Sequence, residues 1–229
     1  MIVAMRHVFY LHGFASSPTA TKAAFFAERL RSHGLELHCP DFNEPDFEYV
    51  TVTRMLDQLD DALAALPPGP VALIGSSLGG FVAFHAAARH GAARGRPRTS
   101  LRPIDRLVLF APAFEFGRTP FGGLSEEDMR RWRDTDRHEF LHHAGNRLRA
   151  VRYALYEDAW RYDSAAAAVD TPALIFQGRR DTVVEPAMVE RFGASRHAMS
   201  VRMLDDDHQL GSSLELMWRE TAAFLGLCD

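Results

Sequence analysis

The fold is decided by one stretch, residues 71–85, which reads VALIGSSLGGFVAFH. An apolar, strand-like run ends at Gly75, and a helix-like run begins just after Ser77. Gly75, Ser77 and Gly79 form Gly-x-Ser-x-Gly, the pattern typical of a nucleophile elbow, in which a serine occupies a strained turn between a strand and a helix. The two glycines are required because neighbouring backbone packs against them. The stretch therefore predicts that the Ser77 hydroxyl projects from the edge of a sheet.

Two other interpretations of this stretch stay open at the level of sequence. The pattern is short, and an ordinary glycine-rich turn produces it by chance. Ser76 is a rival for the nucleophile, but in its register the flanking positions are Ile74 and Leu78. Both side chains are too bulky for the turn, so Ser77 is the better candidate.

Composition and charge limit the classes of protein to which the chain can belong. With 229 residues, 47% of them hydrophobic and 24% charged, it is long enough for one globular domain with a sizeable core. A net charge of −4 at pH 7 gives no basis for a nucleic-acid or anionic-membrane partner. We expect no disulfide between the two cysteines, Cys39 and Cys228, and a reducing cytoplasm is the simplest location.

Two apolar segments raise the question of targeting or membrane insertion. Residues 1–5 are apolar, but Arg6 and His7 interrupt them before a signal-peptide cleavage site develops. Residues 62–87 lack Asp, Glu, Lys and Arg, yet prolines and glycines at 67–70 and the glycines of 75–80 divide them. Neither piece reaches the ~20 residues of a spanning helix. We therefore expect no signal peptide and no transmembrane segment.

Short apolar runs alternate with helical patterns along most of the chain. We expect strands at residues 7–11, 35–39, 71–74, 107–110, 173–176 and 200–204, and helices at residues 21–32, 49–66, 78–90 and 212–225. This alternation predicts an α/β domain with a mainly parallel sheet covered by helices on both faces. The basic loop at 91–103 has no interleaved aromatic residues for base stacking, so we expect a solvated surface loop there.

Residues 114–165, called the insertion below, interrupt this alternation. The insertion is helical in character and dense in charge, yet it carries eight large aromatic side chains: Phe114, Phe116, Phe121, Trp132, Phe140, Tyr153, Tyr156 and Trp160. Such a segment between two core strands predicts a small helical lid or cap over a pocket. The alternative is an amphipathic helical layer whose aromatic residues only dock it on the core.

Two further loops supply partners for Ser77. A serine hydroxyl is a weak nucleophile, so it needs a base within hydrogen-bond reach and a group that orients that base. Asp181 follows the fifth expected strand and a glycine, and His208 follows the sixth. We expect His208 to exchange the proton of Ser77, and Asp181 to fix the histidine tautomer and stabilise the imidazolium.

Other acids and histidines compete for these roles. Rivals of Asp181 are Asp158, Asp163, Asp205, Asp206 and Asp207. A metal site at residues 205–208 or at His142-His143 is disfavoured because adjacent residues rarely point at one ion, and no zinc spacing accompanies them. We therefore expect neither a metal nor a cofactor.

Two backbone N–H groups are candidates for an oxyanion hole. The N–H of Leu78 lies at the start of the helix that follows Ser77. The second donor is expected from the loop after the first strand, where the N–H of Phe14 follows Gly13, which allows close approach of the backbone. His12 is expected to brace this loop rather than to transfer protons.

Together these motifs resemble the α/β-hydrolase superfamily, whose catalytic residues follow the same order of serine, aspartate and histidine. More narrowly, residues 11–18, 40–47 and 74–80 are similar to the YqiA/YcfP-type small bacterial esterases. The resemblance implies that Ser77, Asp181 and His208 form the catalytic triad and that simple carboxylic esters are substrates. Phe42, bulkier than expected, and the long loop 91–103 depart from the pattern without touching the triad. With the two usual leading strands missing, the six strands are expected in the order 2-1-3-4-5-6, and the ligand crevice falls between the first and third.

The sequence thus predicts a serine esterase that forms an acyl-enzyme on short to medium acyl esters of small molecules. A thioesterase or acyl-transfer enzyme uses the same residues, and a non-catalytic ligand-binding scaffold is a more remote alternative. A dehalogenase needs a carboxylate where Ser77 stands, so that class is disfavoured. The sequence says nothing about the oligomeric state.

Overall fold

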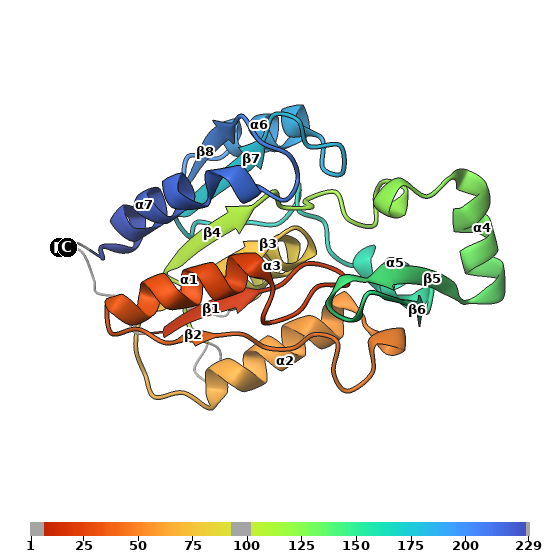
Figure 1. The fold of residues 1–229 in the computed structure, drawn as a ribbon, viewed down its shortest axis with the longest axis horizontal. Helices are drawn as coiled ribbons and strands as arrows, with labels where there is room; N and C mark the ends of the chain where they lie inside the picture. The colour runs from red at the N-terminus through yellow and green to blue at the C-terminus, as the bar shows by residue number, and fades with distance from the viewer. Residues whose placement is uncertain (1–6, 93–101, 228–229) are drawn as a thin grey trace.

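The computed structural model describes residues 7–92 and 102–227, which are built around a six-stranded sheet (Figure 1). Its strands are β1 (His7–Leu11), β2 (Leu37–His38), β3 (Val71–Ser76), β4 (Arg106–Phe110), β7 (Ala173–Gly178) and β8 (Met199–Leu204). They lie in the order β2-β1-β3-β4-β7-β8, and each neighbouring pair is parallel. This confirms the predicted α/β class and strand order, because β7 and β8 are the fifth and sixth strands of the sheet.

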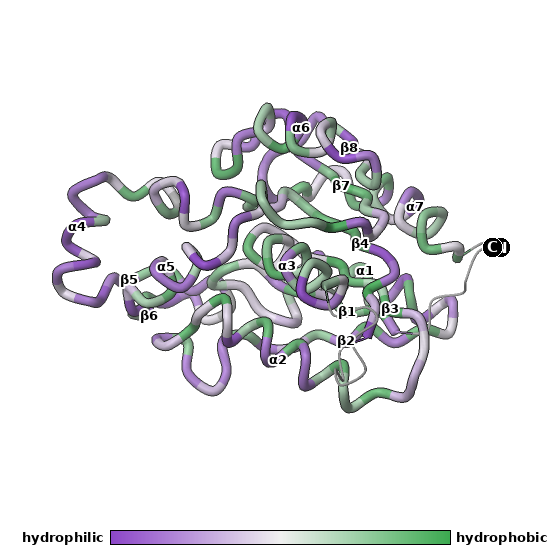
Figure 2. The backbone as a smooth tube through the Cα atoms, turned by 180° about the vertical axis from the view of Figure 1, so that it is seen from behind, coloured by the Kyte–Doolittle hydropathy of each residue, from purple (hydrophilic) through white to green (hydrophobic). Residues whose placement is uncertain are grey.

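Helices cover both faces of the sheet, because alternate strand residues point to opposite sides. Val8 and Tyr10 of β1 belong to a core shared with α1 (Thr21–Ser32) and α7 (Leu214–Leu225). Phe9 and Leu11 belong to the other core, shared with α2 (Val52–Ala64), α3 (Leu78–Ala92) and α6 (Pro186–Ala194). Figure 2 shows these inner strands as largely hydrophobic and the projecting helix α4 as hydrophilic.

Several boundaries differ from those expected. β2 has only two paired residues. The helix expected at 49–66 is present as α2 over the shorter range Val52–Ala64, and a 3-10 turn, Phe47–Tyr49, precedes it. α2 begins at Val52 because the Thr51 side chain accepts the N–H of Arg54 as an N-cap. α6 was not expected, although Pro186 stands at its first turn, where proline is favoured.

The insertion is only partly helical, which corrects the expectation of a helical lid. It contains α4 (Glu126–Thr135) and α5 (Ala154–Ala159), but between them runs an antiparallel hairpin of β5 (His138–His142) and β6 (Arg147–Val151). Trp132 of α4 is fully buried against this hairpin, and its indole N–H donates to Val151 O at 2.8 Å. The residues of β5 alternate between partly buried and exposed positions. The many charged and aromatic residues of the insertion hide this alternation in the sequence.

Some expectations fall partly or wholly outside the described residues. These are the interpretation of residues 1–5, most of the basic loop 91–103, and Cys228. Cys39 is described and is not in a disulfide. In the part of the chain that the structure covers, no helix combines the length and the apolar character needed to cross a bilayer.

Candidate active site

Ser77 occupies the turn between β3 and α3, with φ at +53°. Non-glycine residues rarely adopt this conformation, so the surrounding structure must hold it. The N–H of Ser77 donates to Phe110 O at the end of β4, at 2.8 Å, and its carbonyl accepts the N–H groups of Gly80 and Phe81 at 2.9 and 3.1 Å. The strained turn is thus fixed on both sides of the serine.

The two motif glycines are required by the approach of neighbouring backbone. A Cβ atom on Gly79 would lie 2.0 Å from Leu11 O, and one on Gly75 would lie 2.4 Å from Gly79 O. No side chain fits either position, which is the packing that the Gly-x-Ser-x-Gly pattern predicts. Ser76, the rival serine, is the last residue of β3 and is buried.

His208 follows β8 and lies between Ser77 and Asp181. Its Nε2 is 3.2 Å from Ser77 Oγ, and its Nδ1 is 2.8 Å from Asp181 Oδ2. An ionised carboxylate only accepts hydrogen bonds, so Nδ1 carries the proton and Nε2 faces the serine hydroxyl as an acceptor. The structure therefore brings the three residues of the predicted triad together in one hydrogen-bonded chain.

Asp181, in the loop after β7, is held by four donors. Its Oδ1 accepts the N–H groups of Val183 and Val184 at 2.8 and 2.9 Å, and its Oδ2 accepts His208 and Gln177 Nε2, the latter at 2.9 Å. Burial raises the pKa of this carboxyl, but the hydrogen bonds from His208, Val184 and Val183 outweigh it, and the net pKa lies below its ordinary value. Gln177 was not singled out from the sequence, since nothing marks a buried strand glutamine as a carboxylate partner.

The rival acids are committed elsewhere. Asp206 accepts Ser213 Oγ, Asp207 accepts the N–H of Gln209, and Asp205 pairs with Arg180 on the surface. Asp158 accepts Thr53 Oγ1 and Asp163 caps the N–H groups of Ala165 and Ala166. Across the described residues, no group of three or more His, Cys, Asp or Glu side chains could hold a metal ion.

Gly178 brings the loops of Asp181 and His208 together. A Cβ atom there would lie 2.4 Å from Asp207 O, so the glycine allows the close approach of the two loops. Lys22 of α1 also ties down the second loop, because its Nζ donates to Gln209 O at 2.6 Å. Nothing in the sequence connects Lys22 with His208.

The N–H groups of Phe14 and Leu78 lie beside the serine. Both residues line the same cleft as Ser77 and His208, and neither N–H has an acceptor among the described residues. Gly13 lets the segment after β1 pass close to the elbow, since a Cβ there would lie 3.2 Å from Ser76 O. This segment, residues 12–17, is called the β1 loop below.

His12 is buried inside the β1 loop and has both ring nitrogens occupied. Its Nε2 accepts the N–H of Phe42 at 3.0 Å, so Nδ1 carries the proton and donates to Gly13 O at 2.9 Å. Burial lowers the pKa of His12, although Gly13 and Asp41 act in the opposite direction. A neutral ring with two fixed partners braces the backbone.

A cleft of about 1400 Å³ opens over Ser77 and His208. One wall is largely aromatic, with Phe14 of the β1 loop and Phe116, Phe121 and Phe140 of the insertion. Other residues that line the cleft are polar and include Ser17, Lys22 and Gln209. The insertion therefore forms part of the cleft wall beside the candidate nucleophile.

The sequence profile of an uncharacterised protein family, UPF0227, matches residues 7–225. The chain belongs to the UPF0227 family. A search of the curated proteins finds no match. Every element that carries the site lies within the matched range, so this UPF0227 protein contains the whole constellation in its family domain.

Solved structures similar to this UPF0227 protein share its fold. A protein from Agrobacterium vitis S4 inferred to be a hydrolase has a TM-score of 0.80 at 22% identity, covering 96% of this chain and 88% of that one. Est1E from Butyrivibrio proteoclasticus with ferulic acid bound has a TM-score of 0.79 at 18% identity, covering 97% and 88%. Mouse α/β hydrolase domain-containing protein 10 has a TM-score of 0.73 at 18% identity, covering 100% and 93%. At these identities the likenesses show that the chain has the fold of these proteins, which agrees with the predicted α/β-hydrolase fold.

Proposed function

We propose that this protein is a serine hydrolase that cleaves carboxylic esters of small molecules through an acyl-enzyme. The observation that carries the proposal is the chain Ser77–His208–Asp181, with distances of 3.2 and 2.8 Å, next to two N–H groups without acceptors among the described residues. A buried carboxylate, a neutral imidazole and a serine on an elbow are the parts that acyl transfer needs. Est1E, whose fold is similar, has ferulic acid bound, and ferulic acid is a carboxylic acid of the kind that ester hydrolysis releases, which agrees with this proposal.

In the first half-reaction, Ser77 Oγ attacks the ester carbonyl carbon while His208 Nε2 takes the hydroxyl proton. The carbonyl oxygen becomes an oxyanion that accepts the N–H groups of Phe14 and Leu78. Asp181 stabilises the imidazolium through Nδ1. When the tetrahedral intermediate collapses, His208 gives its proton to the departing alkoxide, and the acyl group stays on Ser77.

In the second half-reaction, water replaces the alcohol. His208 Nε2 removes one proton from the water, whose oxygen attacks the acyl carbon and forms a second oxyanion. Collapse of this intermediate breaks the bond to Ser77 Oγ, and the proton held by His208 returns to that oxygen. The carboxylic acid leaves, and the starting state is restored.

For the acyl group we propose short to medium chains in the aromatic part of the cleft, with the insertion acting as a lid. The insertion contributes apolar wall, but only two helices and one hairpin, which is little structure to cover a long lipid groove. A series of p-nitrophenyl esters tests this, and a rate maximum above about C12 would contradict it. Comparing acyl-CoA with alkyl esters tests the thioesterase alternative.

The triad itself is tested by paired serine variants. Ser77→Ala should lower the rate of p-nitrophenyl acetate hydrolysis by at least ~10⁴-fold, because the nucleophile is lost. It should also abolish covalent labelling by a fluorophosphonate, read by intact mass. Ser76→Ala, the neighbouring serine, should still be labelled on Ser77. Near-wild-type hydrolysis by Ser77→Ala would refute the proposal, and failure of the wild type to be labelled would favour the scaffold alternative.

The setting we propose is the cytoplasm, with no nucleic-acid or membrane partner. The unpaired Cys39 thiol and the modest negative charge of −4 support this, without bearing on the chemistry.

A further inference from the structure

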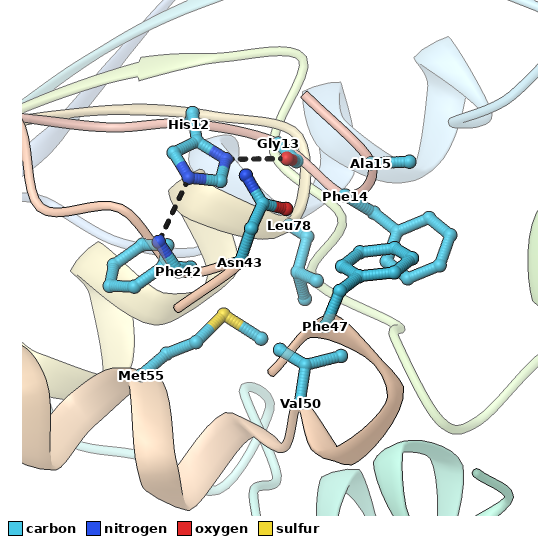
Figure 3. Close-up of a pocket in the computed structure, with 10 residues that line it drawn as sticks. All are labelled: His12, Gly13, Phe14, Ala15, Phe42, Asn43, Phe47, Val50, Met55 and Leu78. Carbon is cyan, nitrogen blue, oxygen red and sulfur yellow. Dashed lines mark hydrogen bonds between the residues drawn. The ribbon is translucent and has the colours of Figure 1, made fainter. Parts of the chain in front are cut away.

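The direction of the Phe14 N–H depends on the peptide group between Gly13 and Phe14. A trans peptide is planar, so its N–H points opposite to its C=O. The Gly13 carbonyl accepts His12 Nδ1, and the other nitrogen of that ring accepts the N–H of Phe42. Figure 3 shows the His12 ring bonded to Gly13 and to the Phe42 backbone, with Asn43 and Leu78 close by. One end of the β1 loop is thus fixed by the segment after β2.

Two later carbonyls of the β1 loop, those of Ala15 and Ser16, are held from outside it. Ala15 O accepts the N–H of His143 at 2.9 Å, and Ser16 O accepts Asn43 Nδ2 at 2.9 Å. Ala15 itself has φ at +55°, a conformation that a non-glycine residue keeps only when its neighbours enforce it. The loop therefore needs these external hydrogen bonds to present Phe14 as observed.

Asn43 is the side chain on which these contacts converge. It is 7% exposed, and its Nδ2 donates both to Ser16 O and to Asp41 Oδ1, the latter at 2.6 Å. Its Oδ1 lies 3.0 Å from His142 Nε2, so that nitrogen is the donor. His142 is the last residue of β5, which means that one amide joins the hairpin of the insertion to the β1 loop.

The ring of Phe14 is held by the same part of the molecule. It packs edge-on against Phe121 and Phe140 of the insertion, with ring centroids 4.8 and 5.0 Å apart, and tilted against Phe47 at 5.4 Å. Phe47 in turn packs edge-on against His142 at 4.9 Å. Backbone and side chain of the candidate oxyanion donor are therefore both restrained through the insertion.

We infer that Asn43, oriented by His142, is a positioning residue for the oxyanion hole, and that the insertion sets the geometry of the Phe14 N–H as well as lining the cleft. The inference rests on the esterase function proposed above and goes beyond it. Ser16 is partly exposed, so water can satisfy its carbonyl when Asn43 is removed. Loss of Asn43 should therefore loosen the β1 loop more than it destabilises the fold.

The experiment compares Asn43→Ala and His142→Leu with His142→Gln, whose side-chain amide can still donate to Asn43. Each is assayed for kcat and KM on p-nitrophenyl acetate and for inhibition by a trifluoromethyl ketone, which forms a tetrahedral adduct with an oxyanion. Complete loss of one oxyanion donor costs about 10²–10³ in kcat. A misdirected donor should cost less, so we expect kcat to fall ~10- to 100-fold in Asn43→Ala and His142→Leu, with KM changed less than about threefold.

Two further results separate positioning from a general loss of structure. The inhibition constant for the ketone should rise in parallel with the fall in kcat, and His142→Gln should recover most of both. Thr171→Val is the matched control, because it removes a buried hydrogen bond to Ile104 O at 3.1 Å away from the cleft. It should lower the melting temperature and leave kcat unchanged.

The outcomes of this experiment are distinct. Unchanged kcat in Asn43→Ala, unchanged ketone affinity despite a lower kcat, or equal losses in His142→Gln and His142→Leu would each overturn the role of Asn43. If Asn43→Ala does not fold, the role of Asn43 is decided by the two His142 variants, through the ratio of kcat in His142→Gln to kcat in His142→Leu. If the wild-type protein neither hydrolyses the ester nor is labelled at Ser77, the proposed function has failed. Failure of the role of Asn43 alone shows only in the comparison of variants, so the two failures are distinguishable.

Discussion

The Ser77 elbow and the β1 loop lie side by side at the carboxyl edge of the sheet, but different forces hold them. Around Ser77 the constraint is contact between backbone atoms, with no room for a Cβ on Gly75 or Gly79. In the β1 loop the constraint is a set of side-chain and backbone hydrogen bonds from distant segments, including Asn43, His142 and His143. One region is signalled within a few residues of sequence and held by backbone contacts with the neighbouring strands, and the other is assembled by side chains from distant parts of the chain.

This difference predicts different responses to change. A backbone overlap leaves no intermediate state, so substitutions in the elbow should cause large losses. Hydrogen bonds and ring contacts can weaken in steps, so the β1 loop should be tunable through the insertion. The half of the site that carries the nucleophile and the Leu78 N–H is then fixed, while the half that carries the Phe14 N–H can be adjusted.

The largest effect is expected at Asp181, which orients His208, the base beside Ser77. Asp181→Asn should lower kcat by about 10³–10⁴-fold with the fold retained, because an amide cannot hold His208 in the tautomer that accepts from Ser77. Steady-state kinetics on p-nitrophenyl acetate measure this effect. Asp163→Asn, which changes an exposed cap and a rejected rival, should stay within about twofold of wild type. Equal effects of the two variants would remove Asp181 from the proposed triad.

Much of this fixed half could be predicted because its signals are local. The apolar run, the two glycines and the serine lie within a few residues of one another, and sterics dictate their arrangement. The positions of Asp181 and His208 follow from one more rule, that loops after parallel strands gather at one edge of the sheet. The helical layers followed from the alternation of strands and helices, and the strand order followed from the resemblance to α/β-hydrolases.

The assembled half could not be predicted in the same way. Asn43 stands in an ordinary polar loop, and its role depends on His142, which lies 99 residues away. The hairpin went unrecognised because Trp132, Phe140 and their neighbours bury aromatic faces inside the insertion, so the hydrophobic pattern is not that of a strand on the main sheet. Gln177 shows the same limit, since the carboxylate it contacts is defined only once the loop has folded.

A second test compares two glycines on the same helix, one in the elbow and one far from it. Gly79→Ala would force a Cβ atom to within 2.0 Å of Leu11 O, so it should destabilise the protein by more than about 4 kcal/mol or prevent folding. For Gly91, near the end of α3, no described residue beyond its own turn of helix comes within 4 Å of the corresponding position. Gly91→Ala should be neutral or stabilising by up to about 1 kcal/mol, because alanine favours helix. Urea denaturation measures the free energy of unfolding of both variants. A small loss in Gly79→Ala would show that the backbone of the elbow can shift to accommodate a Cβ atom.

The smallest effect is expected at His85, where α3 meets the segment that leaves the insertion. His85 is buried against Phe81 and Tyr162, and its Nε2 lies 3.0 Å from Ser164 Oγ. Burial lowers the pKa of His85 to about 4, with Asp163 acting weakly in the opposite direction. The unfolded chain then binds a proton between pH 6.5 and about 4 that the folded chain does not, so the contribution of neutral His85 is full above pH 6.5 and is lost across that interval.

His85→Gln removes this titration while keeping a donor for Ser164. Between pH 7 and pH 5, the free energy of unfolding should fall by about 1–2 kcal/mol less in the variant than in wild type, since each unit of pKa shift is worth about 1.4 kcal/mol. Urea denaturation at the two pH values gives this difference, and the other buried histidines cancel in the comparison. Equal acid sensitivity of the two proteins would show that His85 already carries its proton in the folded state. The junction between α3 and the insertion would then be more open to water than the burial of His85 indicates.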